Sequence, residues 1–344
     1  MHLYRLALIG FGNVGQGFAE ILRDRGDDLA ERFGVHFQIV AVCDFLKGSL
    51  YDPHGLDPAA LLSAAVESGT LDGLPAAQHG WDALTTISKS DADVVVELSY
   101  TDLQTGQPAL DHMRAALQNG RHVVTTNKGP IALHYQDLSD LAREKGLQIG
   151  IEGTVMSGTP ALYNGRELLA GAGIRRIQGI LNGTTNYILS QMESGASYAA
   201  ALADAQSRGY AEADPTGDVE GIDAAGKAVI LANTLMRGQL RMADVARQGI
   251  TALTPDMIAS AAAANERWKL VALVEGQGST VKASVGPQRL PLSHPLAGVS
   301  GATNAITYST DLLGEVTLVG PGAGRQETGY AIVGDLLAIH RQAH

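Results

Sequence analysis

Short apolar runs alternate with amphipathic stretches through the first 150 residues. The apolar runs are typical of buried strands and occupy residues 3–10, 37–42, 93–98, 122–125 and 147–151. Helical spacing of apolar positions covers residues 14–33, 58–67, 107–119 and 135–145. Strands that alternate with helices favour right-handed crossovers around a parallel sheet. We therefore predict an α/β domain with a doubly wound parallel sheet over residues 1–150.

The pattern changes in the second half of the chain. Candidate strands lie at residues 175–181, 268–275, 280–285, 305–310 and 316–319. Candidate helices lie at residues 185–194, 198–207, 222–236 and, after a glycine-rich stretch, 329–341. Because the strands are not regularly separated by helices, we expect an α+β domain with a mixed sheet over residues 151–319.

Composition and charge narrow the classes of function. The 344 residues are 45% hydrophobic and 18% charged, which is typical of a globular chain. The net charge of −11 argues against nucleic acid or an anionic membrane surface as a partner. Cys43 is the one cysteine and lies in an apolar run, so we interpret it as a small buried side chain. One cysteine, no signal peptide and no apolar run of about 18 residues indicate a cytoplasmic protein.

A glycine-rich loop joins the first strand to the first helix. It reads GFGNVG and matches the dinucleotide-binding pattern of a Rossmann-type domain at Gly10, Gly12, Asn13, Val14 and Gly15. Glycines allow a tight turn and let a pyrophosphate approach the N–H groups of the helix N-terminus. The alternative interpretation is a glycine-rich turn that binds no ligand. The position between strand and helix favours the dinucleotide.

The choice between NAD and NADP is left open by the sequence. Asp44 ends the second strand, where a carboxylate can bind the 2′-hydroxyl of the adenosine ribose of NAD. Lys47 follows closely and could meet the 2′-phosphate of NADP instead, although a solvated loop charge is an equal alternative.

Residues 205–227 form a segment rich in acidic residues that ends in Lys227. Asp223 and Lys227 are four residues apart on a predicted helix, so they share a face. A lysine can stabilise the alkoxide formed when hydride reaches a carbonyl carbon, and can donate a proton to it. A surface ion pair is one alternative. A calcium loop is another, but the spacing does not fit the twelve-residue EF-hand pattern.

The same segment carries a longer pattern. It resembles the signature of the homoserine dehydrogenase family at Ala205, Gly209, Tyr210, Asp214, Pro215, Asp218, Val219, Gly221, Asp223 and Lys227. Further segments resemble the family at residues 126–128 (TNK), 152–160 (EGTVMSGTP), 182–187 (NGTTNY) and 322–328 (GAGRQET). The resemblance therefore covers essentially the whole chain.

The resemblance implies an NAD(P)-dependent interconversion of L-homoserine and L-aspartate 4-semialdehyde in threonine, methionine and isoleucine biosynthesis. It implies that Lys227 donates the proton, with Asp223 and Lys128 as further catalytic residues. The implied substrate ligands are Glu212, which faces the amino group, and Asp218, Asp223, Gly183, Thr184 and Tyr210. The implied cofactor contacts beyond the glycine loop and Asp44 are Ser99, Lys128, Gly209 and Gly324.

Three structural features are also implied by the resemblance. A structural monovalent cation, usually sodium, would be held by backbone carbonyls at Glu152, Val155, Ser157 and Thr159. A homodimer would form through the second, substrate-binding domain. The last helix, within about residues 320–344, would complete the first domain. The chain resembles short members without a regulatory domain, so we expect little inhibition by threonine.

Two alternatives remain at this point. The chain could be an oxidoreductase for a different amino-acid aldehyde or alcohol. It could instead be a cofactor-binding protein that senses redox state without catalysis. The Asp223 and Lys227 pair argues against the sensor, because binding alone does not need it. Turnover of homoserine distinguishes an enzyme from a sensor.

Overall fold

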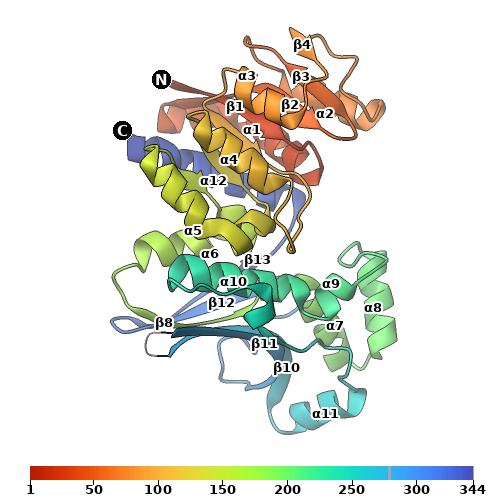
Figure 1. Cartoon of the computed structure of the whole chain (residues 1–344). Helices are drawn as coiled ribbons and strands as arrows, with labels where there is room; N and C mark the ends of the chain where they lie inside the picture. The colour runs from red at the N-terminus through yellow and green to blue at the C-terminus, as the bar shows by residue number, and fades with distance from the viewer. Residues whose placement is uncertain (278–279, 344) are drawn as a thin grey trace. The chain divides into compact units, whose positions relative to one another are not determined.

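The computed structural model describes residues 1–277 and 280–343 (Figure 1). The chain divides into two compact units. Unit 1 consists of Met1–Gly158 together with Gly324–His344, and unit 2 is Thr159–Ala323. Unit 1 is thus built from two separated stretches of chain, whereas unit 2 is continuous. The domain limits given by the sequence stay a prediction.

A seven-stranded sheet forms the centre of unit 1. Its order is β4-β3-β2-β1-β5-β6-β7, and the five strands from β2 to β7 in that order run parallel. β3 and β4 add two short antiparallel strands at one edge. The order changes direction between β1 and β5, which is where doubly wound sheets bind their ligands. The strands are β1 (His2–Ile9), β2 (Val35–Asp44), β3 (Gly48–Tyr51), β4 (Gln78–His79), β5 (Val94–Glu97), β6 (His122–Thr125) and β7 (Ile149–Gly150).

Helices surround this sheet. α1 ends at Phe33, and the next residue, Gly34, caps it with a φ of 70° in the left-handed region. α12 packs against α1 and, with η1 and β7, belongs to the same unit (Figure 1). The helices of unit 1 are α1 (Asn13–Phe33), α2 (Pro58–Glu67), α3 (Ala83–Lys89), α4 (Ala109–Gln118), α5 (Lys128–Glu144), the 3-10 turn η1 (Glu152–Thr154) and α12 (Arg325–Ala343).

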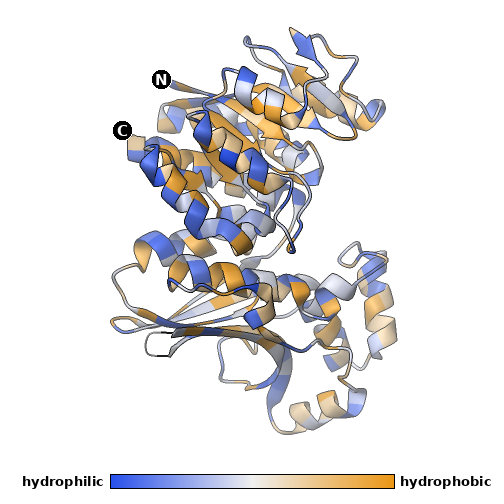
Figure 2. Ribbon diagram, viewed as in Figure 1, coloured by the Kyte–Doolittle hydropathy of each residue, from blue (hydrophilic) through white to orange (hydrophobic). Residues whose placement is uncertain are grey.

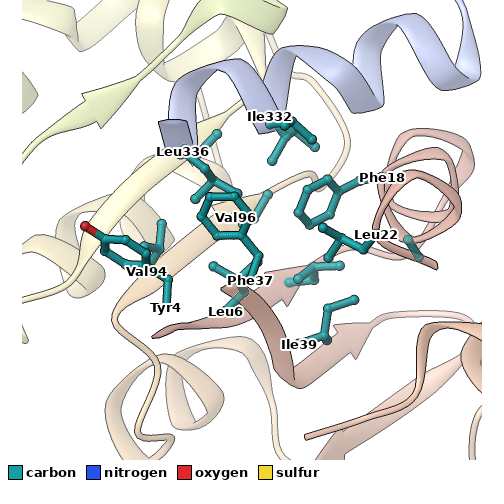
Figure 3. Close-up of a cluster of buried hydrophobic side chains, with 14 of the residues drawn as sticks. Tyr4, Leu6, Phe18, Leu22, Phe37, Ile39, Val94, Val96, Ile332 and Leu336 are labelled. Atoms are coloured by element: carbon teal, nitrogen blue, oxygen red, sulfur yellow. The ribbon is translucent and has the colours of Figure 1, made fainter. Parts of the chain in front are cut away.

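The core of unit 1 combines both stretches of its chain. Figure 3 shows Phe18 and Leu22 of α1 and residues of β1, β2 and β5 beside Ile332 and Leu336 of α12. The ribbon of the parallel strands is mostly orange in Figure 2, as expected for strands covered on both faces. Residues of α12 therefore contribute to the buried apolar surface that stabilises this unit, at about 25 cal/mol per Å².

Unit 2 contains a six-stranded mixed sheet of order β13-β12-β8-β10-β11-β9. β9 pairs in parallel with β11, and the other pairs are antiparallel. α10 packs along β10 and β11, and α7 packs against β10 and β12. The strands are β8 (Ile174–Ile180), β9 (Ala246–Arg247), β10 (Glu266–Gln277), β11 (Thr280–Pro291), β12 (Thr303–Thr310) and β13 (Gly314–Pro321). The helices are α6 (Ala161–Tyr163), η2 (Asn164–Leu168), α7 (Gly183–Glu193), α8 (Tyr198–Ser207), α9 (Thr216–Val219), α10 (Ile222–Leu235), η3 (Met242–Asp244) and α11 (Pro255–Ala263).

The predicted fold class is confirmed, with differences in individual elements. α5 begins at Lys128, seven residues before the predicted start at 135. Asn127 caps this helix through the Gly129 N–H, and Pro130 is tolerated because it lies in the first turn. The structure also contains α3, α11, β3 and β4, which the sequence pattern did not predict.

Within residues 1–277 and 280–343, none of the helices has the length and apolar character needed to cross a membrane.

Candidate functional site

The glycine loop ends β1 and opens α1 in unit 1. Gly10 has a φ of 106°, and a Cβ there would lie 2.6 Å from the Leu98 carbonyl oxygen, so only glycine fits. A Cβ on Gly15 would lie 2.9 Å from the Gly10 carbonyl. Gly12 is the N-cap of α1, has no side-chain cap, and would point a Cβ into open space. The first turn of α1, with Asn13 and Val14, therefore has room at its N-terminus for an anionic group.

Asp44 is tied to this loop. Its Oδ2 accepts from the Phe11 N–H at 2.7 Å, and its Oδ1 accepts from the Leu46 and Lys47 N–H groups, each at 3.0 Å. The Lys47 Nζ lies 3.9 Å from Asp44 Oδ1, and the two side chains are 19% and 12% exposed. The carboxylate at the end of β2 thus holds the glycine loop in position and partners the lysine that follows it.

A second polar network lies at the ends of β5 and β6. Ser99 donates both its N–H and its hydroxyl to Glu97 Oε1, and Glu97 Oε2 lies 2.7 Å from His112 Nδ1. Asn127 Nδ2 donates to the carbonyls of Ser99 and Tyr100, at 3.0 and 2.9 Å. Because Asn127 caps α5, Lys128 begins that helix next to the Ser99 segment.

Lys227 lies in unit 2, in the second turn of α10. Its Nζ donates to Asp223 Oδ2 at 2.7 Å and to the Leu181 carbonyl at 2.6 Å. Lys227 is only 7% exposed, so the surface ion-pair interpretation is wrong. The predicted shared face of Asp223 and Lys227 is confirmed. The lysine is held at the residue that follows β8, with its charge compensated by the partly buried carboxylate of Asp223, whose side chain is 18% exposed.

Asn182 connects two acidic residues beside Lys227. Its Nδ2 donates to Asp218 Oδ1 at 2.7 Å and to Asp223 Oδ2 at 3.1 Å. Its Oδ1 accepts from the Thr185 N–H, so the same side chain caps α7. Burial raises the pKa of the Asp218 carboxyl, and the hydrogen bond from Asn182 partly offsets this.

The remaining predicted residues of unit 2 lie on the segments around this cluster. Gly183 begins α7, where a Cβ would lie 2.5 Å from the Ala302 carbonyl. The Thr184 hydroxyl donates to the Tyr210 carbonyl at 2.6 Å, which joins the start of α7 to the segment after α8. Gly209 precedes Tyr210 with a φ of 74°, and Glu212 follows it with an exposed side chain.

The proposed cation ligands belong to both units. Glu152 lies in η1 and Val155 follows it, while Met156 and Ser157 both have positive φ, at 59° and 55°. Two consecutive residues with positive φ are uncommon outside glycine, and they orient the carbonyl groups of this turn differently from those of a helix or strand. Thr159 begins unit 2, and its carbonyl accepts from the Ala161 N–H at 2.7 Å. Among the described residues, no three or more His, Cys, Asp or Glu side chains are grouped so that they could hold a metal ion, so a cation at this turn would depend on carbonyl oxygens.

The predicted residues thus fall into two sets. Unit 1 contains the glycine loop, Asp44, Ser99, Lys128 and Gly324, which immediately precedes α12. Unit 2 contains the Lys227 cluster and the segments at its edge. Sequence reasoning missed Asn182, Glu97 and His112 as members of these networks. Glu97 could have been identified because it is a charged residue at the end of the apolar run DVVVEL.

Two family models match this chain. One, described as homoserine dehydrogenase, matches residues 160–337. The other, described as homoserine dehydrogenase, NAD binding domain, matches residues 10–152.

Known proteins and solved structures are similar over nearly the full length. The NAD(+)-dependent homoserine dehydrogenase of Pseudomonas canavaninivorans is 45% identical, covering 99% of this chain and 97% of that protein. The homoserine dehydrogenase of Methanocaldococcus jannaschii is 39% identical, covering 97% and 98%. A crystal structure of a putative homoserine dehydrogenase from Archaeoglobus fulgidus has a TM-score of 0.89 at 36% identity, covering 98% and 99%. A hyperthermophilic archaeal homoserine dehydrogenase mutant in complex with NADPH has a TM-score of 0.84 at 31% identity, covering 99% and 98%.

Proposed function

The chain belongs to the homoserine dehydrogenase family, and on that premise we propose that it interconverts L-homoserine and L-aspartate 4-semialdehyde with NAD(P). The observation that carries this proposal is the buried Lys227, paired with the partly buried Asp223 and held at the end of β8. A glycine loop alone would serve any dinucleotide-binding protein. A buried lysine with a fixed carboxylate supplies the acid–base group that carbonyl reduction needs.

Lys227 is the proton donor in this proposal. The ammonium gives a proton to the aldehyde oxygen as negative charge develops there, and takes it back in the oxidation of homoserine. Asp223 and the Leu181 carbonyl hold the Nζ in one position, so little reorganisation is needed. Asn182 holds Asp223 and Asp218 at a fixed separation. Lys128 is the further catalytic residue, as a second cation for the developing charge.

The substrate is bound by the segments around α7 and α9. Homoserine carries an ammonium and a carboxylate in addition to its hydroxyl. Glu212 binds the ammonium, and Asp218 and Asp223 supply further carboxylate oxygens. Gly183, Thr184 and Tyr210 form the rest of the wall through backbone groups that the Thr184 hydrogen bond holds together.

The groups of unit 1 fit a dinucleotide. Gly12 leaves open space where a side chain would stand, and the uncapped N-terminus of α1 offers N–H donors to a pyrophosphate. The further cofactor contacts in this proposal are Ser99, Lys128 and Gly324 of unit 1 and Gly209 of unit 2. The cofactor, when bound, supplies or accepts the hydride.

We propose that NAD is preferred over NADP. The Asp44 carboxylate lies where the adenosine ribose is expected, and its charge would repel a 2′-phosphate. Lys47 is engaged with Asp44 rather than directed to a phosphate of its own. The Pseudomonas canavaninivorans relative is NAD(+)-dependent, which supports the same preference.

Further features of the proposal rest on the family resemblance. They are a homodimer through unit 2, a sodium ion on the carbonyls of Glu152, Val155, Ser157 and Thr159, and a role in threonine, methionine and isoleucine biosynthesis. The proposal also includes a cytoplasmic location, which is supported by the single cysteine rather than by the resemblance. The consecutive positive φ values at Met156 and Ser157 support a cation site, because they fix the carbonyls of that turn.

The test is the absorbance of the reduced nicotinamide with purified protein, L-homoserine and either NAD+ or NADP+. We expect turnover with homoserine, none with serine or threonine, and a higher kcat/KM with NAD+. If folded protein supplied with sodium or potassium gives no turnover with either cofactor, the proposed reaction is wrong. Faster turnover with NADP+ would overturn only the cofactor preference.

A further inference from the structure

A fully buried carboxylate lies beneath the proposed cofactor contact Ser99. Glu97 ends β5 and is 0% exposed. The chemistry proposed above makes no use of it. Ionised groups are seldom buried without a structural or functional reason, because removing a carboxylate from water is costly unless donors replace the lost hydrogen bonds.

Donors meet both oxygens of Glu97. The Ser99 N–H donates to Oε1 at 2.8 Å, and the Ser99 hydroxyl donates to the same oxygen. His112 of α4, itself buried, places Nδ1 at 2.7 Å from Oε2. The carboxylate is therefore fixed between α4 and the segment that follows β5.

The hydrogen bond to Glu97 determines what Ser99 can offer to a ligand. A serine hydroxyl has one proton and two acceptor lone pairs. Because the proton is directed to the carboxylate, the half-buried Ser99 oxygen can only accept from a ligand. A charge-assisted hydrogen bond to a carboxylate also makes that oxygen a stronger acceptor.

The same segment is held from its other side. Asn127 Nδ2 donates to the carbonyls of Ser99 and Tyr100, and the Glu97 carbonyl accepts from the Thr125 hydroxyl at 2.9 Å. The preceding residue, Leu98, abuts Gly10 of the glycine loop. Ser99 is thus fixed at the point where the strand order of the sheet changes direction.

We infer that Glu97, held by His112, is a positioning residue that makes Ser99 a hydrogen-bond acceptor for a donor group on the nicotinamide half of the cofactor. The donor is the carboxamide NH2 or a ribose hydroxyl. The inference rests on the proposed function, which places a nicotinamide dinucleotide in unit 1.

Calorimetric titration with the preferred oxidised cofactor tests this without any turnover. Ser99→Ala and Glu97→Leu should each weaken binding roughly tenfold, the effect of losing one hydrogen bond to a charged or polarised partner. The double variant should bind no more weakly than either single variant, because both changes remove the same acceptor. Glu97→Gln should stay within about threefold of the unaltered chain, since its amide oxygen can accept from Ser99.

Asp93→Asn is the matched control. Asp93 precedes the same strand at its opposite end, where it accepts from the Arg5 N–H at 2.7 Å, so the control should leave affinity unchanged. If Glu97→Leu does not fold by circular dichroism, His112→Leu takes its place in the same cycle, with an expected loss of about threefold. In steady state, Ser99→Ala and each active leucine variant of Glu97 or His112 should raise the KM for cofactor more than the KM for homoserine, and Asp93→Asn should change neither.

The acetylpyridine analogue of the cofactor, which has a methyl group in place of the carboxamide NH2, identifies the donor. If that NH2 is the donor, the analogue binds the unaltered chain roughly tenfold more weakly, and Ser99→Ala adds no further loss. If the analogue binds as tightly as the cofactor while Ser99→Ala and Glu97→Leu still weaken binding, a ribose hydroxyl is the donor.

Two results would overturn the inference. One is unchanged affinity in a folded Glu97→Leu or His112→Leu variant. The other is a double variant whose losses simply add. If the unaltered chain binds cofactor but does not oxidise homoserine, only the proposed reaction is wrong. The role of Glu97 and Ser99 in cofactor binding is then still tested by these affinities.

Discussion

At the scale of single residues, the site is organised by polar side chains that hold other polar side chains. Asn182 fixes Asp218 and Asp223, which in turn fixes Lys227. The helical spacing of Asp223 and Lys227 could be predicted from the sequence because the pair is local. Asn182 could not, because its partners lie 36 and 41 residues further along the chain.

Removing the Lys227 amine should abolish catalysis without affecting the cofactor. Lys227→Ala is expected to lower kcat by at least about 100-fold, the usual contribution of a general acid. The cofactor dissociation constant should change less than about twofold, since the proposed pyrophosphate contacts are elsewhere. Steady-state kinetics and calorimetry measure the two effects. Lys282→Ala, an exposed lysine of β11, is the control, and equal loss of turnover and cofactor affinity in Lys227→Ala would indicate a structural role instead.

Glu212 should affect the substrate and not the cofactor. Glu212→Gln keeps the shape of the side chain but removes the charge that is proposed to bind the substrate ammonium. We expect the KM for homoserine to rise roughly tenfold, with the KM for cofactor nearly constant. Because Glu212 is exposed, folding should be unaffected. An unaltered homoserine KM would refute the amino-group assignment.

Asp218 should make stability depend on pH in a particular direction. Burial raises the pKa of this carboxyl above its ordinary value of 3.8. Such a group favours the folded state below its unfolded pKa, and that contribution is lost as pH rises through the folded pKa. Asp218→Asn removes this loss. The melting temperature of the variant minus that of the unaltered chain should therefore be larger at about pH 7.5 than at about pH 4.5.

Asp214→Asn is the control of opposite sign. The hydrogen bond from Thr216 lowers the pKa of the exposed Asp214 carboxyl, so its contribution is present at neutral pH and lost in acid. The melting temperature of this variant minus that of the unaltered chain should be smaller at about pH 7.5 than at about pH 4.5. The same pH trend in both variants would show that Asp218 is not titrating as described.

At the scale of elements, strand and helix periodicity predicted the long buried segments, and local chemistry decided the rest. The first turn of α5 was not predicted because Gly129 and Pro130 usually break helices. In the structure Asn127 is the N-cap of α5, so both residues lie in the first turn, where proline is tolerated. β3 and β4 are short, and β4 is exposed, so they carry little hydrophobic pattern. The hydrogen bond between Glu97 and His112 depends on how α4 packs against β5, which periodicity does not reveal.

The contact between α1 and α12 should depend on glycine. A Cβ on Gly329 would lie 2.7 Å from the Phe18 backbone nitrogen, so Gly329→Ala must push the helices apart. We expect a loss of about 1–3 kcal/mol in the free energy of unfolding. Gly334→Ala in the same helix meets nothing within 4 Å and should gain up to about 1 kcal/mol from helix propensity. Urea unfolding measures both, and equal effects of the two variants would contradict the close packing.

At the scale of the whole molecule, the chain leaves unit 1 after Gly158 and returns to it at Gly324. The two ends of this excursion are close, since a Cβ on Gly158 would lie 2.3 Å from the Glu327 carbonyl oxygen. Unit 2 is continuous and has a hydrophobic cluster of its own, which includes Ile180, Val271 and Ala305.

Each unit should therefore fold when all of its parts are present. We expect residues 159–323 alone to unfold cooperatively on heating, and residues 1–158 alone not to fold, because Ile332 and Leu336 are missing from their core. Joining residues 1–158 to 324–344 through a short glycine and serine linker should restore folding and cofactor binding. Circular dichroism and calorimetry report these outcomes, and a folded fragment 1–158 would show that α12 is dispensable.

The position of α12 at the end of the given sequence has a consequence for folding during synthesis. During synthesis the ribosome makes all of unit 2 before it makes α12, the helix that closes the nucleotide-binding core. We expect residues 1–158 to expose apolar surface while the 165 residues of unit 2 (159 to 323) are synthesised. Such surface is what holdase chaperones recognise and what proteases attack. A premature stop codon that removes only α12 would therefore eliminate the cofactor unit, even though it leaves every proposed catalytic side chain intact.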